Sequence, residues 1–168
     1  MSFLTLGISR CFICDRPIDA RIEAAQLEYA SPEDVGDVAR RGRAWVHRAC
    51  WQAWPTRRAW CASTCRLMAA APGVTRVRSV MVRPVGSSLL LTDAGAPISI
   101  TVPRDQVVSV CDALRSPQPA TVTFDHVAWQ FSRLASTIRL IAAQGSERFL
   151  DFVIEDPDAW CDALTAQL

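Results

Sequence analysis

Short runs of alternating apolar and polar residues dominate the chain after residue 73. Three β-rich runs come first, broken at Pro84-Val85-Gly86 and at Ala94-Gly95: TRVRSVMVRPV, SLLLTDA and PISITV. Runs of this kind between turn residues predict three strands. The next segment, RDQVVSVCDALR, has apolar residues at positions 107, 110, 111 and 114 instead. This spacing predicts a helix.

The same order of segments recurs in residues 119–168. The β-rich runs here are ATVTFDHVAWQFSRL, TIRLIAA and RFLDFVI, and they are followed by DPDAWCDALTAQL. Apolar residues recur in the last segment at 160, 161, 164 and 168. Asp156 and Pro157 are residue types favoured at the N-cap and the first position of a helix, so a second helix is predicted to begin there.

An internal duplication is suggested when the sequence is shifted by 50 residues. Seven residues of 81–115 are then identical to residues in 131–165 without a gap, including CDAL at 111–114 and again at 161–164. We therefore expect two βββα units, at about 74–118 and 119–168, which form one mainly antiparallel sheet with both helices on one face. The helix residues expected to pack against this sheet are Val107, Val110, Cys111, Leu114, Trp160, Cys161 and Leu164.

Residues 1–73 are predicted to form a separate module, which makes the whole chain an α+β protein of two domains, 1–73 and 74–168. IEAAQLEYAS and VARRGRAWV are each long enough for a strand, and the turn-forming residues of PEDVGD separate them. HRACWQAW predicts a short helix, and a longer one is predicted from about Thr56 to Pro72-Gly73. Cys61 and Cys65 share one face of that helix, where core packing is favoured over a second metal site.

Two closely spaced pairs in this module have the pattern of a zinc site. Cys11 and Cys14 form C-x2-C, and His47 and Cys50 form H-x2-C. Tetrahedral zinc takes four such ligands, two from a short turn and two from the start of a helix. A thioredoxin-like redox pair is one alternative, although only ten residues precede Cys11. Four buried cysteine and histidine side chains without a metal are the other.

Residues 8–55, about a third of the chain, resemble the treble-clef zinc-finger superfamily in their order of knuckle, hairpin and helix. The ligand order is similar to that of the first finger of LIM domains. The 32 residues between Cys14 and His47 exceed the usual spacing in a LIM finger, and no second finger follows. The resemblance implies that Cys11 and Cys14 are knuckle ligands, that His47 and Cys50 are helix ligands, and that the zinc is structural.

Catalytic motifs are missing from the sequence, so we do not expect an enzyme. Treble-clef nucleases of the HNH type need a catalytic histidine, but His47 is assigned to zinc and the one other histidine is His126. We find no Gly-rich phosphate loop, nucleophile elbow or paired-carboxylate motif.

Cysteine content and hydropathy limit the cellular compartments in which we expect the protein. The chain has seven cysteines and half of its residues are apolar, without an export signal or the roughly 18-residue apolar run that a membrane span needs. We expect a soluble, cytoplasmic protein with reduced thiols and no membrane association.

Charge is distributed unevenly, although the net charge is only +1. No acidic residue lies between Asp37 and Asp93, and ten arginines fall in residues 40–83: Arg40, Arg41, Arg43, Arg48, Arg57, Arg58, Arg66, Arg76, Arg78 and Arg83. Arginines interleaved with aromatic residues are typical of nucleic-acid binding. The near-neutral total argues against it, because basic domains of that class usually have a pI above about 9.

Binding to another protein is the function that we favour from the sequence, as an adaptor, regulator or immunity-type inhibitor. Tryptophan is enriched at binding hot spots, and Trp45, Trp51, Trp54 and Trp60 lie close together around the predicted zinc ligands. These rings supply the core of a small module equally well. The candidate binding residues are Arg40, Arg41, Arg43, Arg48, Arg57, Arg58, Trp51 and Trp54.

Overall fold

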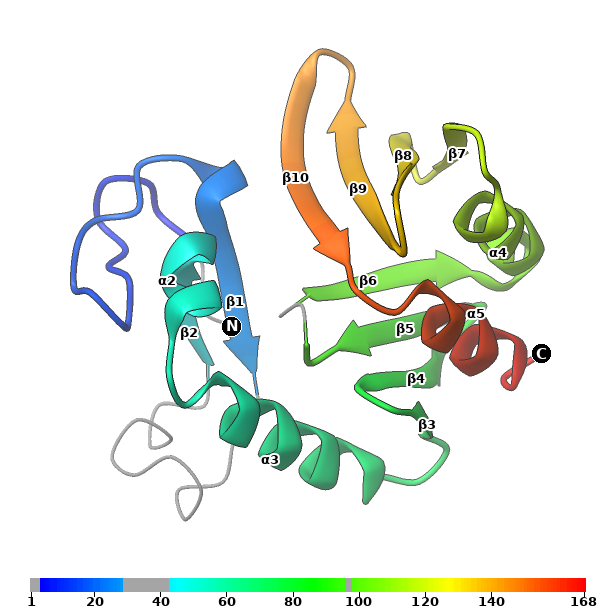
Figure 1. The fold of residues 1–168 in the computed structure, drawn as a ribbon, viewed down its shortest axis with the longest axis horizontal. Helices are drawn as coiled ribbons and strands as arrows, with labels where there is room; N and C mark the ends of the chain where they lie inside the picture. Colours follow the sequence, from blue (N-terminus) through cyan, green and yellow to red (C-terminus); the bar gives the residue numbers. More distant parts are fainter. Residues whose placement is uncertain (1–3, 29–42, 96–97) are drawn as a thin grey trace. The chain divides into compact units, whose positions relative to one another are not determined.

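A computed structural model describes residues 4–28, 43–95 and 98–168. Helices and sheets of antiparallel strands make this an α+β protein, and the chain divides into two compact units, Met1–Ala71 and Pro72–Leu168 (Figure 1). Within the described residues, no helix is long and apolar enough to cross a membrane.

In its described residues, the first unit has one hairpin and two helices. Its elements are the 3₁₀ turn η1 (Arg21–Glu23), β1 (Ala24–Glu28), β2 (Arg43–His47), α2 (Arg48–Ala53) and α3 (Arg57–Ala69). β1 and β2 pair antiparallel from Ala24 opposite His47 to Glu28 opposite Arg43. The core of this unit consists of Cys11, Ile18, Ala24, Ala25, Val46, Trp51 and Trp60. The predicted hairpin is therefore present, while its PEDVGD turn lies outside the described residues.

The helix α3 lies where the sequence predicts it, beginning after Thr56 and ending before Pro72-Gly73. Gly73 has φ +74°, a conformation that glycine adopts without strain, and lies in the turn that follows the C-cap Ala70. Cys65 is buried on this helix and Cys61 is half-buried against the core of the first unit.

The second unit contains two four-stranded antiparallel sheets, each followed by a helix. The first half comprises β3 (Thr75–Val77), β4 (Val80–Val85), β5 (Ser88–Asp93), β6 (Ile98–Pro103), η3 (Arg104–Gln106) and α4 (Val107–Arg115). The second half comprises β7 (Ala120–Phe124), β8 (Val127–Leu134), β9 (Thr137–Gln144), β10 (Glu147–Ile154) and α5 (Pro157–Thr165). In both sheets the strands pair in chain order. The prediction of three strands per half and of a single sheet was therefore wrong.

Tight turns without glycine explain the extra strands. Val77 pairs with Val80 and Phe124 pairs with Val127, so two residues connect the strands in each case. Asp125 and His126 have φ values of +52° and +61°, as a type I′ turn requires at both central positions. Glycine and asparagine are the usual signals for this turn, and without them each pair of strands was predicted as one long strand.

Each helix of the second unit packs near the sheet of the other half. α5 contacts β3, β4 and β5, while α4 contacts β7, and the two helices contact each other. Arg133 of β8 donates to the Leu114 carbonyl at the end of α4 with an N–O distance of 2.9 Å. The prediction that both helices cover one face of a single sheet was wrong, but all seven predicted helix core residues are buried in one shared core.

Candidate metal centre

Four side chains of the first unit converge on one point. The ligand atoms of Cys11, Cys14, His47 and Cys50 all lie within 4.8 Å of one another, close enough to bind a metal ion. The edge of a tetrahedron of thiolates about 2.3 Å from zinc is roughly 3.8 Å long, so a contraction of about 1 Å or less completes the site. Three sulfurs and one imidazole nitrogen form a donor set that suits zinc.

The knuckle that carries Cys11 and Cys14 is closed by main-chain hydrogen bonds. Asp15 N–H donates to the Cys11 carbonyl at 2.8 Å, and Cys11 N–H donates to the Arg16 carbonyl at 2.8 Å. Asp15 has φ +56°, a left-handed conformation that aspartate tolerates better than most residues. Phe12 N–H donates to the Trp45 carbonyl at 2.9 Å and so ties the knuckle to β2.

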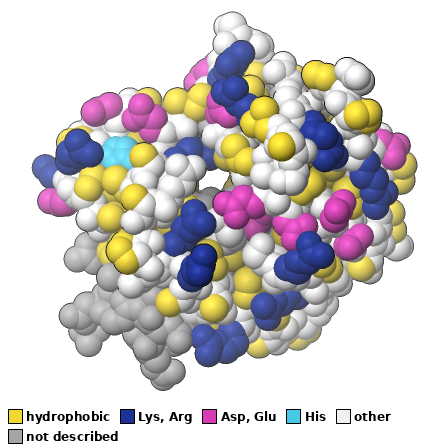
Figure 2. Space-filling model, viewed as in Figure 1, with side chains coloured by type: hydrophobic (Ala, Val, Ile, Leu, Met, Phe, Trp, Pro, Cys, Tyr) yellow, Lys and Arg dark blue, Asp and Glu magenta, His cyan; other side chains and the backbone are white. Residues whose placement is uncertain are grey.

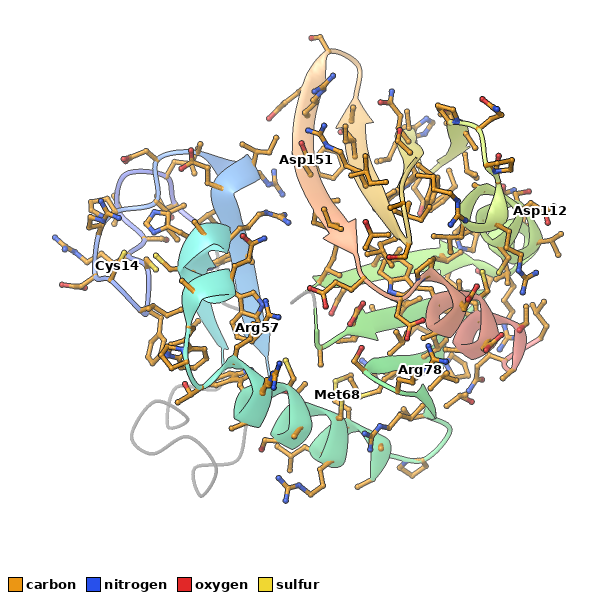
Figure 3. All side chains as sticks on the ribbon, in the orientation of Figure 1. Cys14, Arg57, Met68, Arg78, Asp112 and Asp151 are labelled. Atoms are coloured by element: carbon orange, nitrogen blue, oxygen red, sulfur yellow. The ribbon has the colours of Figure 1, made fainter. Side chains whose placement is uncertain are left out.

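The second ligand pair is positioned by the junction of β2 and α2. His47 is the last residue of β2 and the N-cap of α2, and Cys50 lies in the first turn of that helix. Figure 3 shows Cys14 in the loop beside α2. The Sγ of Cys14 is 3.5 Å from His47 Nδ1, and the Sγ of Cys50 is 4.0 Å from the same atom.

The tautomer of His47 follows from its second nitrogen. His47 Nε2 lies 3.1 Å from the Pro17 carbonyl oxygen, which can only accept a hydrogen bond, so Nε2 carries the proton. In the neutral ring, Nδ1 is then the nitrogen without a proton, and it faces the cysteines. This is the arrangement found at metal-binding histidines, in which a carbonyl orients the ring and leaves the other nitrogen for the metal.

The thiols differ strongly in acidity. The backbone N–H and the guanidinium of Arg16 lower the pKa of Cys14 to about 6, whereas burial and the neighbouring thiols raise the pKa of Cys50 to about 11. Three thiolates at one point repel one another, so a cation is needed to hold all three deprotonated. The sequence analysis did not predict a role for Arg16. Its position two residues after Cys14 is the signal that could have placed it beside the second thiolate of the knuckle.

An aromatic cluster packs beside the ligands. Trp54 lies 6.4 Å from Phe12, 5.7 Å from Trp51 and 5.6 Å from Trp60, measured between ring centroids. Trp51 and Trp60 belong to the core of the first unit, and Trp54 is half-buried against it. Of the two tryptophans proposed for binding, Trp54 is therefore the more accessible.

The proposed binding arginines are in different environments. Arg40 and Arg41 lie outside the described residues, as does the side chain of Arg43. Arg48 is half-buried, and its Nε donates to the Ile22 carbonyl at 2.9 Å. On α3, Arg57 is half-buried and Arg58 is exposed.

Comparison of the chain with protein-family models, with curated proteins and with solved structures finds no match.

Proposed function

We propose that Cys11, Cys14, His47 and Cys50 bind a structural Zn²⁺ ion, and that the protein is a non-catalytic, zinc-stabilised module that binds another protein. The observation that carries this proposal is the convergence of four ligand atoms within 4.8 Å. Four protein ligands fill a tetrahedral zinc site and leave no position for water or substrate, which is typical of structural zinc and not of catalytic zinc.

A treble-clef-like fold and an internal duplication are parts of the same proposal. The order of knuckle, β1–β2 hairpin and α2 supports the treble-clef likeness. For the duplication, the support is that α4 and α5 begin 50 residues apart and have the same length, and that each follows a four-stranded antiparallel sheet.

Apolar side chains beside the knuckle support a protein partner. Leu6 is 49% exposed and Ile8 is 75% exposed. The segment that carries them is held by two main-chain hydrogen bonds of 2.9 Å, from Gly7 N–H to the Ile18 carbonyl and from Ile18 N–H to the Ser9 carbonyl. Exposed apolar residues on a fixed backbone lose little entropy when they are buried by a partner.

Affinity capture with matched variants tests the partner proposal. The zinc-loaded protein and the variants Ile8→Asp and Val108→Asp serve as baits in lysate of the source cells. Val108 is the control because it is an apolar residue of the second unit that is 61% exposed. We expect one protein to be retained by the parent and by Val108→Asp but lost with Ile8→Asp. Identical captures by all three baits would contradict a binding surface beside the knuckle.

Nucleic-acid binding through residues 40–83 is the second candidate function. Arg58 and Arg66 support it, since both are exposed and eight residues apart on α3. Against it, basic side chains in Figure 2 are dispersed over the drawn face with acidic ones among them. Fluorescence anisotropy with labelled DNA and RNA at low and physiological salt decides between the two. Salt-sensitive binding that is lost on changing Arg58 and Arg66 to Ser would favour nucleic acid.

A further inference from the structure

Two buried thiols meet where α4 and α5 contact each other. Cys111 is 2% exposed and Cys161 is fully buried. The Cys111 Sγ lies 4.0 Å from the Cys161 carbonyl oxygen, and the Cys161 Sγ lies 3.8 Å from the Cys111 carbonyl oxygen. The contacts are reciprocal because each cysteine is the fifth residue of its nine-residue helix.

We propose that Cys111 and Cys161 are a redox modification site, at which a low-molecular-weight disulfide such as oxidised glutathione introduces a reversible disulfide bond between α4 and α5. A disulfide needs β-carbons about 3.5–4.5 Å apart, a requirement that few cysteine pairs in a fold meet. Each Sγ lies within 4.0 Å of the other cysteine's carbonyl oxygen, so the two side chains face each other across the contact of α4 and α5. Cys61 and Cys65 differ because they lie on one helix, whose geometry keeps their β-carbons about 5–6 Å apart.

The reaction is two successive thiol–disulfide exchanges. Because both thiols are buried, the exchange takes place when the contact of α4 and α5 opens locally. The Cys111 thiolate then attacks one sulfur of oxidised glutathione, which forms a mixed disulfide and releases one glutathione thiolate. The Cys161 thiolate then attacks the Cys111 sulfur and releases the second glutathione. The two cysteines lose two electrons and two protons, and the small disulfide gains them.

The environment of the pair selects which thiol reacts first. The hydrogen bond from the Cys161 thiol lowers the pKa of Cys111, and the charge of Arg115 acts in the same direction against the effect of burial. The pKa of Cys161 is raised by the same hydrogen bond and by burial. Cys111 is therefore the nucleophile of the first exchange and Cys161 the resolving thiol.

The cross-link joins the helices of the two halves of the second unit. It closes a loop from residue 111 to residue 161, and a loop of this length restricts the unfolded chain substantially. Because α5 packs on the first sheet and α4 contacts the second, the bond fixes both sheets to one helix pair. Oxidation therefore makes the second unit harder to unfold.

Peptide mapping of the full-length, zinc-loaded protein tests this site. The protein is incubated with oxidised glutathione under native conditions, quenched with acid, alkylated and digested with trypsin. Cleavage after Arg104, Arg115 and Arg148 places the two cysteines in peptides 105–115 and 149–168. We expect these two peptides to be linked by a disulfide in the parent and in the control Cys65→Ala. The mass of the linked pair should be two hydrogen masses below the sum of the two peptide masses. The oxidised parent should melt about 5 °C higher or more, and dithiothreitol should reverse the shift.

Three results would overturn the proposal: no joined peptide, a bond from Cys111 or Cys161 to any other cysteine, or a glutathione adduct on Cys111 that does not proceed to the cross-link. Cys111→Ala and Cys161→Ala should each abolish the joined peptide and the melting shift. If either variant fails to fold by circular dichroism, the map of the parent still decides, because it identifies the bonded cysteines directly.

Discussion

Replacing Asp93 with alanine removes the acceptor of a buried hydrogen-bond network in the second unit. Asp93 is 3% exposed at the end of β5. It accepts hydrogen bonds from Trp160 Nε1 at 2.8 Å, from Ser79 Oγ at 3.1 Å and from the Gly95 N–H at 2.9 Å. The bond from Trp160 connects α5 to the first sheet, so we expect the loss of Asp93 to weaken the packing of this helix.

The expected magnitude follows from the burial of the three donors. Trp160 is fully buried, and an indole N–H left without an acceptor or water there costs about 1–3 kcal/mol. Ser79 and Gly95 are half-buried and can turn toward water, so each contributes about 1 kcal/mol or less. Asp93→Ala should therefore lower the free energy of unfolding by about 2–4 kcal/mol.

Urea unfolding of the zinc-loaded protein at pH 7 measures this loss, followed by circular dichroism and by tryptophan fluorescence. Asp112→Ala is the matched control, because Asp112 is exposed on α4 (Figure 3) and should change stability by less than about 0.5 kcal/mol. A double-mutant cycle with Trp160→Phe should give a coupling of about 1 kcal/mol or more. A loss below about 1 kcal/mol for Asp93→Ala, or no coupling with Trp160, would show that this hydrogen bond does not hold α5 to the sheet.

Two further predictions concern the start of α5 and the metal centre. Burial acts to raise the pKa of Asp156, but hydrogen bonds from Arg78 and from the Ala159 N–H lower it overall, so Asp156→Ala should cost about 1–2 kcal/mol at pH 7. The difference in unfolding free energy between the parent and Asp156→Ala should persist above the unfolded-state pKa of aspartate, near 4, and shrink as the pH falls through the lower folded-state pKa. Urea midpoints measured at a series of acid pH values test this. A difference that grows toward low pH would contradict it. Arg16→Ala removes the guanidinium beside Cys14 and should weaken zinc binding in competition with a chelator, with Arg58→Ala on the exposed face of α3 as the control. Equal zinc affinities for the two variants would exclude this role of Arg16.

Local signals in the sequence predicted much of the secondary structure. Asp156 and Pro157 mark the start of α5, and the Asp156 carboxylate accepts the capping hydrogen bond from Ala159 N–H at 3.1 Å. The four candidate metal ligands also come together as their spacing predicted, because a knuckle and the first turn of a helix each impose their geometry locally. The identity of the metal stays a prediction.

Long-range contacts and unusual turns were not accessible from the sequence. The turn at Asp125 and His126 has left-handed backbone conformations at both residues without the glycine or asparagine that usually marks such a turn, so the sequence predicts β7 and β8 as one strand. The packing of each helix near the other half's sheet depends on contacts such as Trp160 with Asp93, which lie 67 residues apart. Periodicity shows which face of a helix is buried, but not which sheet buries it.

We propose above that one zinc ion folds the first unit through Cys11, Cys14, His47 and Cys50. Native mass spectrometry of the purified protein, with the variants Cys50→Ala and Cys65→Ala, tests it most directly. We predict one zinc per chain in the parent and in Cys65→Ala, and none in Cys50→Ala. The metal-free form should also lose the tryptophan fluorescence of the folded aromatic cluster. A parent without zinc, or a Cys50→Ala variant that retains it, would show that these four residues do not form a zinc site.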